Sequence, residues 1–280
     1  MVECLPSLAL NSRRLWTGKY SLQDISRPET TRAIVPIDDS KPEALGISLG
    51  YAKMIAQRAT PRTGNIILLT HTKQQLRSTS LESHLGAQAS KALAANKAVG
   101  IGDGFMMQNE TMQTLRFGAR NSVIIAFYAD EKMLDFVDGL SGVVGCIAVP
   151  WLEDGAKAWG ERWTPHIHGQ ARQAPTSLLS DPVIENALRT LSRMANLAHG
   201  VMHPRDKQYA DEILRILRAN GHSAPAGDIK SWAIREGWKP EAADELARLA
   251  SKIFELKNKP NLSALHDPSG RYARWKDGDA

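Results

Sequence analysis

Three glycines alternate around one acid in the stretch VGIGDGF, where Gly100, Gly102 and Gly104 surround Asp103. Closely spaced glycines let backbone N–H groups hold a phosphate, above all where a helix begins just beyond them. The polar residues from Asn109 onward predict such a helix start. The spacing matches neither a P-loop nor a dinucleotide fingerprint, because it is G-x-G-x-G and no lysine follows. Two interpretations stay open: a cofactor or phosphate loop, or a plain turn that needs positive φ.

A second set of candidates follows from the ends of three apolar runs. The runs NIILLTHT (65–72), SVIIAFY (122–128) and VVGCIAVPW (143–151) are rich in β-branched residues and each predict a buried strand. In an open parallel sheet, ligands bind beyond the carboxyl ends of the strands. The side chains that follow these runs are therefore candidates for a site.

His71 lies at the end of the first run, Asp130 just beyond the second and Trp151 at the end of the third. A histidine titrates near neutral pH and can act as an acid or a base, while Asp130 can orient it or hold a cation. Asp130 also suits the N-cap of the helix that follows, which needs no catalysis. The candidate catalytic residues are His71, Asp103 and Asp130, with Gly100–Gly104 as the candidate cofactor-binding loop.

Other catalytic and metal-binding patterns are weak in this sequence. His166 and His168 flank one residue, and His199 and His203 have i, i+4 spacing, but no third ligand and no H-E-x-x-H motif accompany them. No G-x-S-x-G elbow is present. Cys146 lies within an apolar run and is predicted to be a buried thiol. We predict no metal site.

The second half of the chain contains the segment DIKSWAIREGWKP, in which Ile229, Trp232, Ala233 and Gly237 form the pattern I-x-x-W-A-x-x-x-G. This pattern resembles the C-terminal domain of Lsr2-type nucleoid proteins, where the first helix precedes a loop that enters the AT-rich minor groove. The resemblance implies a helix–turn–helix shape with Trp232 in its core. The sequence GWKP stands where that family has its R-G-R element.

Four basic residues around this segment are candidates for nucleic-acid binding: Lys230, Arg235, Lys239 and Arg248. Lysine and arginine side chains contact phosphates without reading base sequence. The alternative is that these four residues form an ordinary solvated face. The net charge of +5 is compatible with DNA or RNA as a partner but does not require one.

Helices and strands must position these candidate residues, and the pattern of hydrophobic residues predicts where those helices and strands lie. Strands alternate with helical segments through the first half, which indicates βαβ units and a parallel sheet, whereas every later periodic segment is helical. We predict an α/β fold: a small three-layer, parallel-sheet (Rossmann-like) domain followed by a helical bundle domain. The expected parts are an extended arm (1–39), the α/β domain (40–165), a linker (166–180), the helical domain (181–257) and a flexible tail (258–280).

The leading functional hypothesis is a non-catalytic, cytoplasmic, bacterial protein. Its α/β domain binds a ligand or partner, and its helical domain associates with nucleic acid or protein. The sequence contains no apolar run long enough to span a membrane and no secretory signal pattern. The alternative is an enzyme acting on a nucleotide or phosphorylated substrate at the carboxyl ends of the strands. A third possibility is a structural subunit that docks on a larger assembly.

Overall fold

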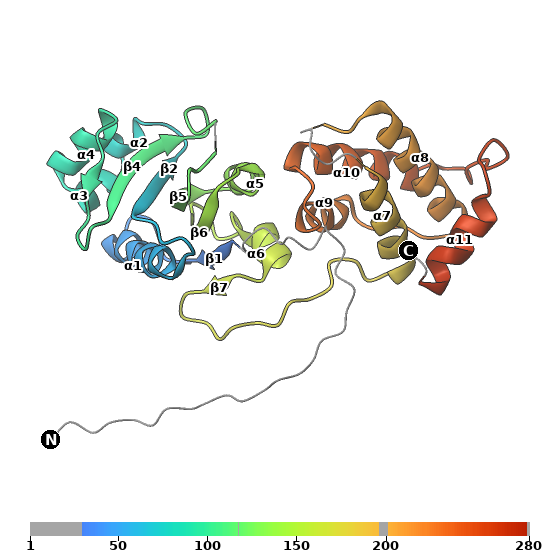
Figure 1. The fold of residues 1–280 in the computed structure, drawn as a ribbon, viewed down its shortest axis with the longest axis horizontal. Helices are drawn as coiled ribbons and strands as arrows, with labels where there is room; N and C mark the ends of the chain where they lie inside the picture. Colours follow the sequence, from blue (N-terminus) through green and yellow to red (C-terminus); the bar gives the residue numbers. More distant parts are fainter. Residues whose placement is uncertain (1–29, 117, 196–200, 279–280) are drawn as a thin grey trace, which may run out of the picture.

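A computed structural model describes residues 30–116, 118–195 and 201–278 (Figure 1). Most of the predicted N-terminal arm lies outside the described residues, as do Cys4 and His199. Within the described ranges, no helix is both long enough and apolar enough to cross a bilayer.

The first half folds around one seven-stranded sheet, which confirms the α/β class. The strand order is β3-β4-β2-β5-β6-β1-β7, and every neighbouring pair is parallel except β3 with β4. The strands are β1 (Thr31–Ile34), β2 (Asn65–Thr70), β3 (Val99–Gly100), β4 (Met106–Thr111), β5 (Ser122–Ala129), β6 (Val143–Pro150) and β7 (His166–Ile167). The apolar runs that predicted strands correspond to β2, β5 and β6.

Helices cover both faces of the sheet. One face packs against α1 (Pro42–Arg58), α2 (Gln75–Ser78), α3 (Ser80–Leu85) and α4 (Ala87–Ala94). The other face packs against α5 (Glu131–Gly139) and α6 (Lys157–Trp163). Alternate side chains of β2 pack against the two helical layers, Leu68 against the first and Leu69 against the second. This alternation explains why the strand reads as an unbroken apolar run.

The second half is helical and has a core of its own. It comprises α7 (Pro182–Met194), α8 (Pro204–Ala219), α9 (Ala226–Arg235), α10 (Pro240–Phe254) and α11 (Pro268–Asp277). Leu188, Ile213, Trp232, Leu246 and Trp275 are buried in one shared cluster. In Figure 1, α5 and α6 lie between the sheet and these five helices. The two halves therefore meet through the second helical layer of the sheet.

Three expectations from the sequence are wrong. In each case a segment is buried by contacts with residues that are far away in the sequence. Residues 31–34 of the expected arm form β1, which is held between β6 and β7. The helix expected to begin at Asn109 is absent, because Met106–Thr111 is a strand paired with β2. The expected flexible tail contains α11, whose Trp275 is 2% exposed.

The segment 81–97 has apolar residues at helical spacing, but it does not form one continuous helix. It is divided into α3 and α4 at Gly86, whose φ of +77° suits glycine and ends the first helix. The hydrophobic spacing continues across the break, since Leu81 and Leu93 are both buried in the same layer. Periodicity alone therefore did not reveal the interruption.

Candidate functional site

The sheet changes winding direction between β2 and β5, which are neighbouring parallel strands. The chain leaving β2 passes through α2–α4 on one face, and the chain leaving β5 passes through α5 on the other. In open α/β sheets, such a switch point separates the two outgoing loops and forms the usual ligand crevice. His71 follows β2 and Asp130 follows β5, so both lie at this point.

The structure brings these two predicted residues together. Nε2 of His71 lies 3.8 Å from Oδ2 of Asp130, and the side chains are 21% and 47% exposed. The other carboxylate oxygen of Asp130 accepts a hydrogen bond of 2.7 Å from the backbone N–H of Met133. Asp130 is thus the N-cap of α5, as the sequence predicts, and keeps its second oxygen beside His71.

An irregularity at the end of β5 shapes the end of the sheet beside His71. The register with β6 shifts between Phe127 and Ala129, and Tyr128 between them adopts a φ of +63°. A bulky residue in this conformation is strained, and such outliers gather where a backbone group must be aimed. Here the carbonyl oxygen of Tyr128 lies 2.9 Å from Nε2 of His71. The bulge therefore fixes the imidazole ring.

The carbonyl contact also assigns the histidine tautomer. A carbonyl oxygen only accepts hydrogen bonds, so Nε2 of His71 carries the proton that is donated to Tyr128. In the neutral ring Nδ1 is then an acceptor. The backbone N–H of His71 is held separately by Oε1 of Gln75 at 2.9 Å. The ring thus presents a fixed acceptor at the carboxyl edge of the sheet.

An exposed indole lies beside this imidazole. The ring of Trp151, which follows β6, is centred 6.5 Å from that of His71 and 6.3 Å from that of Tyr128. Trp151 is 60% exposed and its neighbour Leu152 is 71% exposed. Large apolar side chains this exposed next to polar groups are typical of contact surfaces. The sequence analysis had predicted Trp151 at the carboxyl end of a strand, and it directly follows β6.

The side chain of Tyr128 belongs to a hydroxyl network that sequence reasoning missed. The Tyr128 hydroxyl donates to Oγ1 of Thr79 at 2.6 Å and lies 3.1 Å from Oγ of Ser80. Ser80 in turn donates to the backbone oxygen of Asp39 at 3.1 Å. Partial burial, reinforced by the neighbouring Asp38 carboxylate, raises the pKa of Asp39. This edge of the sheet therefore carries acidic groups from the loop after β1 as well as Asp130.

The glycine-rich stretch lies at the opposite end of the strands, where β4 begins. Gly102–Gly104 form the tight turn of the β3–β4 hairpin, with φ of +84° at Gly102 and +78° at Gly104. Asp103 within the turn pairs with Nζ of Lys53 at 3.0 Å. The turn precedes β4, whereas His71 follows the adjacent parallel strand β2, so the full length of the strands separates them. Asp103 and Gly100–Gly104 are thus not brought together with His71 and Asp130.

His166, His168 and His203 have polar partners of other kinds. The Tyr51 hydroxyl lies 2.9 Å from Nε2 of His166 and 3.1 Å from Nδ1 of His168. His203 caps α8 by accepting from the backbone N–H of Arg205. Among the residues that the structure describes, no three His, Cys, Asp or Glu side chains are grouped as a metal site would need. Cys146 is buried, as predicted, and burial raises the pKa of its thiol.

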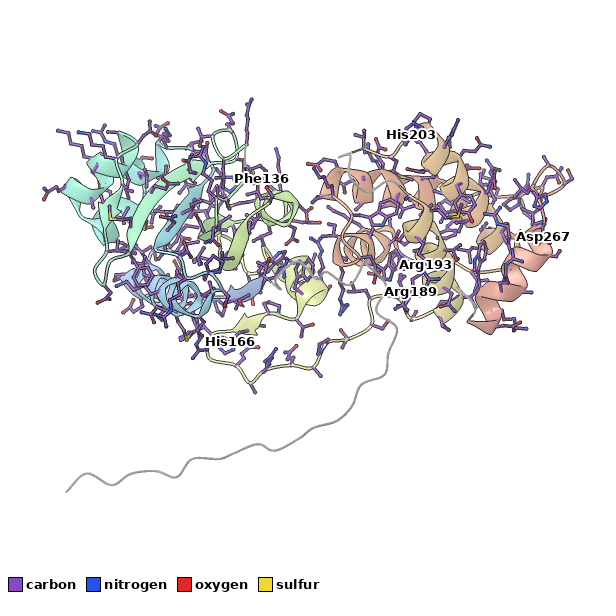
Figure 2. All side chains as sticks on the ribbon, in the orientation of Figure 1. Phe136, His166, Arg189, Arg193, His203 and Asp267 are labelled. Carbon is purple, nitrogen blue, oxygen red and sulfur yellow. The ribbon has the colours of Figure 1, made fainter. Side chains whose placement is uncertain are left out.

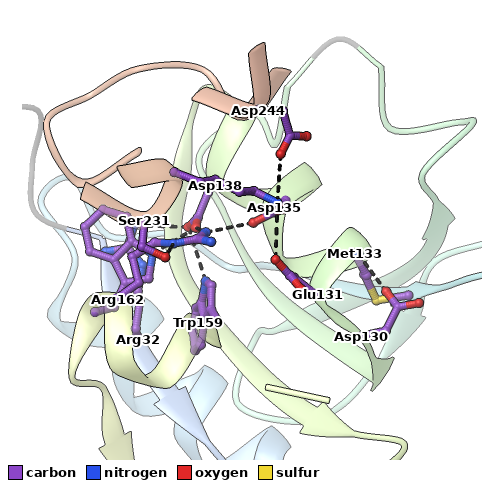
Figure 3. A network of polar contacts seen from close by, with 12 residues as sticks. Arg32, Asp130, Glu131, Met133, Asp135, Asp138, Trp159, Arg162, Ser231 and Asp244 are labelled. Carbon is purple, nitrogen blue, oxygen red and sulfur yellow. Dashed lines mark hydrogen bonds and ion pairs between the residues drawn. The ribbon is translucent and has the colours of Figure 1, made fainter. Parts of the chain in front are cut away.

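A polar network joins the sheet domain to the helical segment (Figure 3). Arg162 is fully buried, and its Nη1 lies 2.7 Å from Oδ1 of Asp135 and 2.9 Å from Oδ2 of Asp138. Nε of Arg162 also reaches Oγ of Ser231 on α9 at 3.4 Å. Asp138 additionally accepts from the indole N–H of Trp163 at 2.8 Å. The network contains a buried cation, which requires such partners.

Lys230, a predicted phosphate ligand, belongs to this network. Its Nζ lies within ion-pair distance of Asp135, Glu131 and Asp244, and its side chain is 15% exposed. Arg235 donates to the backbone oxygen of Thr176 in the linker. Lys239 is half-buried and Arg248 is exposed. The four residues therefore do not share one environment.

The turn after α9 is packed inward. Trp238 is 3% exposed, and its indole N–H donates to Oγ of Ser192 at 2.8 Å. Pro240 is buried and borders Gly139, where an added Cβ would lie 3.2 Å from its ring. Trp232 is buried, as the resemblance implied. The segment GWKP thus belongs largely to the protein interior.

Comparison with known proteins yields one family match. The model of a family described as a domain of unknown function (DUF1889) matches residues 180–276, from the start of α7 into α11. No curated protein and no solved structure matches the chain. The match coincides with the helical segment and includes residues 258–276, most of the tail that the sequence pattern had predicted to be flexible.

Proposed function

We propose that this protein binds a small organic ligand at the carboxyl edge of its sheet, in a Rossmann-like arrangement. The observation that carries the proposal is the bulge at Tyr128, whose carbonyl fixes His71 beside Asp130 at the switch point. A strained backbone that orients a partly exposed polar group is a feature of binding sites more than of packing. The exposed Trp151 supplies an apolar surface next to it.

The groups around the crevice indicate the chemistry of the ligand. Nδ1 of His71 accepts hydrogen bonds, and the carboxylates of Asp38, Asp39 and Asp130 follow β1 and β5 at the same edge. These acceptors and negative charges favour a ligand that carries N–H donors or a positive charge. A flat ligand would stack on the indole of Trp151. We therefore propose a nucleobase-like or guanidinium-like ligand.

The competing proposal is an enzyme acting on a nucleotide or phosphorylated substrate at the same edge. His71 supports acid–base chemistry, because its Nδ1 is an acceptor and Asp130 would stabilise the protonated ring. The geometry supports phosphate chemistry less well, because carboxylates surround the crevice and the glycine turn lies at the other edge. Conversion of the bound compound by the wild type, lost in His71→Ala, would favour the enzyme.

Thermal denaturation of the full chain would test the ligand proposal. Adenine, cytosine and agmatine serve as probes, since a ligand that binds only the folded state raises the melting temperature. We expect a concentration-dependent rise with at least one probe, reduced in Trp151→Ala and His71→Ala but kept in Met194→Ala, which changes an exposed apolar residue on α7. A rise that survives both site variants, or no rise with any probe, would contradict the proposal.

We also propose that the helical segment associates with nucleic acid through the end of α10. Arg248 and Lys252 are exposed one turn apart, and the exposed Lys257 and Lys259 continue beyond the helix. Fluorescence anisotropy with labelled DNA and RNA would test this. We expect binding that weakens with salt. Binding should be lost in a variant that combines Arg248→Glu with Lys252→Glu, and it should be kept in the control variant Lys41→Glu. Binding that is equal in all three proteins would exclude this surface and favour a protein partner.

A further inference from the structure

A cavity of about 750 Å³ lies at the amino ends of the strands, and His71 is not among the residues that line it. It is bordered by the second half of α1, the first residues of β1 and β6, and the segment from Trp163 to His166. His166 lies on β7 at the margin of the sheet (Figure 2). Pockets of a few hundred to a thousand cubic ångströms are the size that small organic ligands occupy.

The charged groups that line this cavity are all basic. Arg32, Arg58 and Arg172 contribute guanidinium groups, and no Asp or Glu lines it among the described residues. Arg32 is already engaged, because Nη2 lies 3.4 Å from Oδ1 of Asp138 and Cζ lies 3.5 Å from the centre of the Trp163 ring. The structure thus leaves two further positive charges at the cavity.

Arg58 and Arg172 are both exposed, and neither side chain has a hydrogen-bond or ion-pair partner within the described part of the chain. They come from different elements, since Arg58 ends α1 and Arg172 lies in the linker after β7. A guanidinium group binds phosphate through paired N–H donors, which makes arginine the usual residue for this purpose. Two unpaired arginines at one cavity therefore favour an anion.

The remaining walls are apolar or aromatic. Met54, Ile55 and Val144 line the cavity together with Tyr51 and Trp163. The Tyr51 hydroxyl is fixed by His166 and His168, so its ring is held in place. From the two arginines and these walls we infer that the cavity binds a phosphate monoester with an aromatic or apolar body. This site is separate from the carboxyl-edge site and takes a ligand of the opposite charge.

Isothermal titration of the full chain at low ionic strength would test this inference. The probes are phenyl phosphate and hexyl phosphate, and phenol and hexanol are their neutral counterparts. We expect saturable binding of at least one phosphate probe and roughly tenfold weaker binding of its neutral counterpart, because the charge-assisted hydrogen bonds are lost. Equal binding of charged and neutral probes, or no binding at millimolar concentration, would overturn the inference.

Variants would locate the site. Arg58→Gln and Arg172→Gln should each weaken phosphate binding roughly tenfold. Arg62→Gln is the matched control, since this exposed arginine does not line the cavity. Trp151→Ala should leave phosphate binding unchanged, which separates this site from the proposed function. Binding that Arg58→Gln and Arg172→Gln leave intact would show that the phosphate binds elsewhere and overturn the inference.

Discussion

Nζ of Lys230 lies 2.6 Å from Oδ2 of Asp135, which joins α9 of the helical segment to α5 beside the sheet. Glu131 and Asp244 add carboxylate oxygens at 3.2 and 3.1 Å (Figure 3). Burial opposes the positive charge on Lys230, but the ion pairs and hydrogen bonds with these carboxylates outweigh it and raise the pKa of Lys230. One ammonium group thus connects the two halves of the protein.

Replacing this lysine should destabilise the fold. Lys230→Met would leave Asp135, whose side chain is 12% exposed, without its closest cation at the interface. Arg162 still pairs with Asp135, so the loss is that of one charge-assisted contact, about 1.5 kcal/mol of unfolding free energy. Urea denaturation at neutral pH would measure this. Lys239→Met should change stability by less than about 0.5 kcal/mol, and equal losses in both variants would contradict the prediction.

The C-terminal helix should contribute to stability, contrary to the sequence expectation of a flexible tail. Trp275 on α11 is 2% exposed within the helical core, and its backbone oxygen accepts from Nδ2 of Asn186 at 2.9 Å. Trp275→Ala removes a large buried side chain and should lower the unfolding free energy by about 3 kcal/mol or more. Lys276→Ala, on the exposed face, is the control. An unchanged urea midpoint for Trp275→Ala would show that α11 is not part of the cooperative unit.

Acid stability should depend on Asp181, the N-cap of α7. Burial opposes its ionisation, but hydrogen bonds from His222 and from the backbone of Val183 outweigh it and lower the pKa of Asp181. A lowered carboxyl pKa stabilises the fold above the ordinary value of 3.8, and this contribution is lost as pH falls through the folded-state pKa. Melting temperatures of Asp181→Asn should therefore fall less steeply than wild type below about pH 5.

The exposed Asp228 provides the control for this acid series, because its side chain makes no polar contact in the described structure. Asp228→Asn should follow the wild-type pH dependence. If Asp181→Asn and Asp228→Asn give the same profile as wild type, the contact with His222 has no part in acid stability.

The thiol of Cys146 should be unreactive in the native protein. It is 1% exposed, and burial, helped by the nearby Asp138 carboxylate, raises its pKa, so the reactive thiolate does not form. In a Cys4→Ser background, Ellman's reagent at mildly alkaline pH should detect a thiol only after denaturation. Rapid reaction of the native variant would contradict the burial of β6.

Local sequence features predicted those elements that carry their own signal. The strands β2, β5 and β6 are apolar on both faces, so their composition alone identifies them. The Asp130 cap follows from a short polar side chain before a helical pattern. His71 and Asp130 were identified together because ligands bind beyond the carboxyl ends of parallel strands. Applying this rule requires knowing where the strands end but not their order in the sheet.

Elements whose burial depends on distant residues were not predictable in this way. β4 alternates buried Met107, Asn109 and Thr111 with more exposed residues, and the side-chain amide of Asn109 donates a hydrogen bond to the backbone oxygen of Leu68 on β2. Its polar residues therefore resembled a helix start. The bulge at Tyr128 and the carboxylates around Lys230 likewise arise from the pairing of remote segments, which no local pattern encodes.

The position of β1 has a consequence for synthesis on the ribosome. Thr31 pairs with Gly145 and Ala33 with His166, so the first described strand is enclosed by the last two strands of the sheet. Nascent β1 cannot complete its pairing until β6 and β7 have left the exit tunnel. Until then its neighbours are absent, and a chain dominated by such long-range pairings folds slowly. Chaperones that shield apolar segments would act in this interval, before the sheet closes around Ala33 and Ile34.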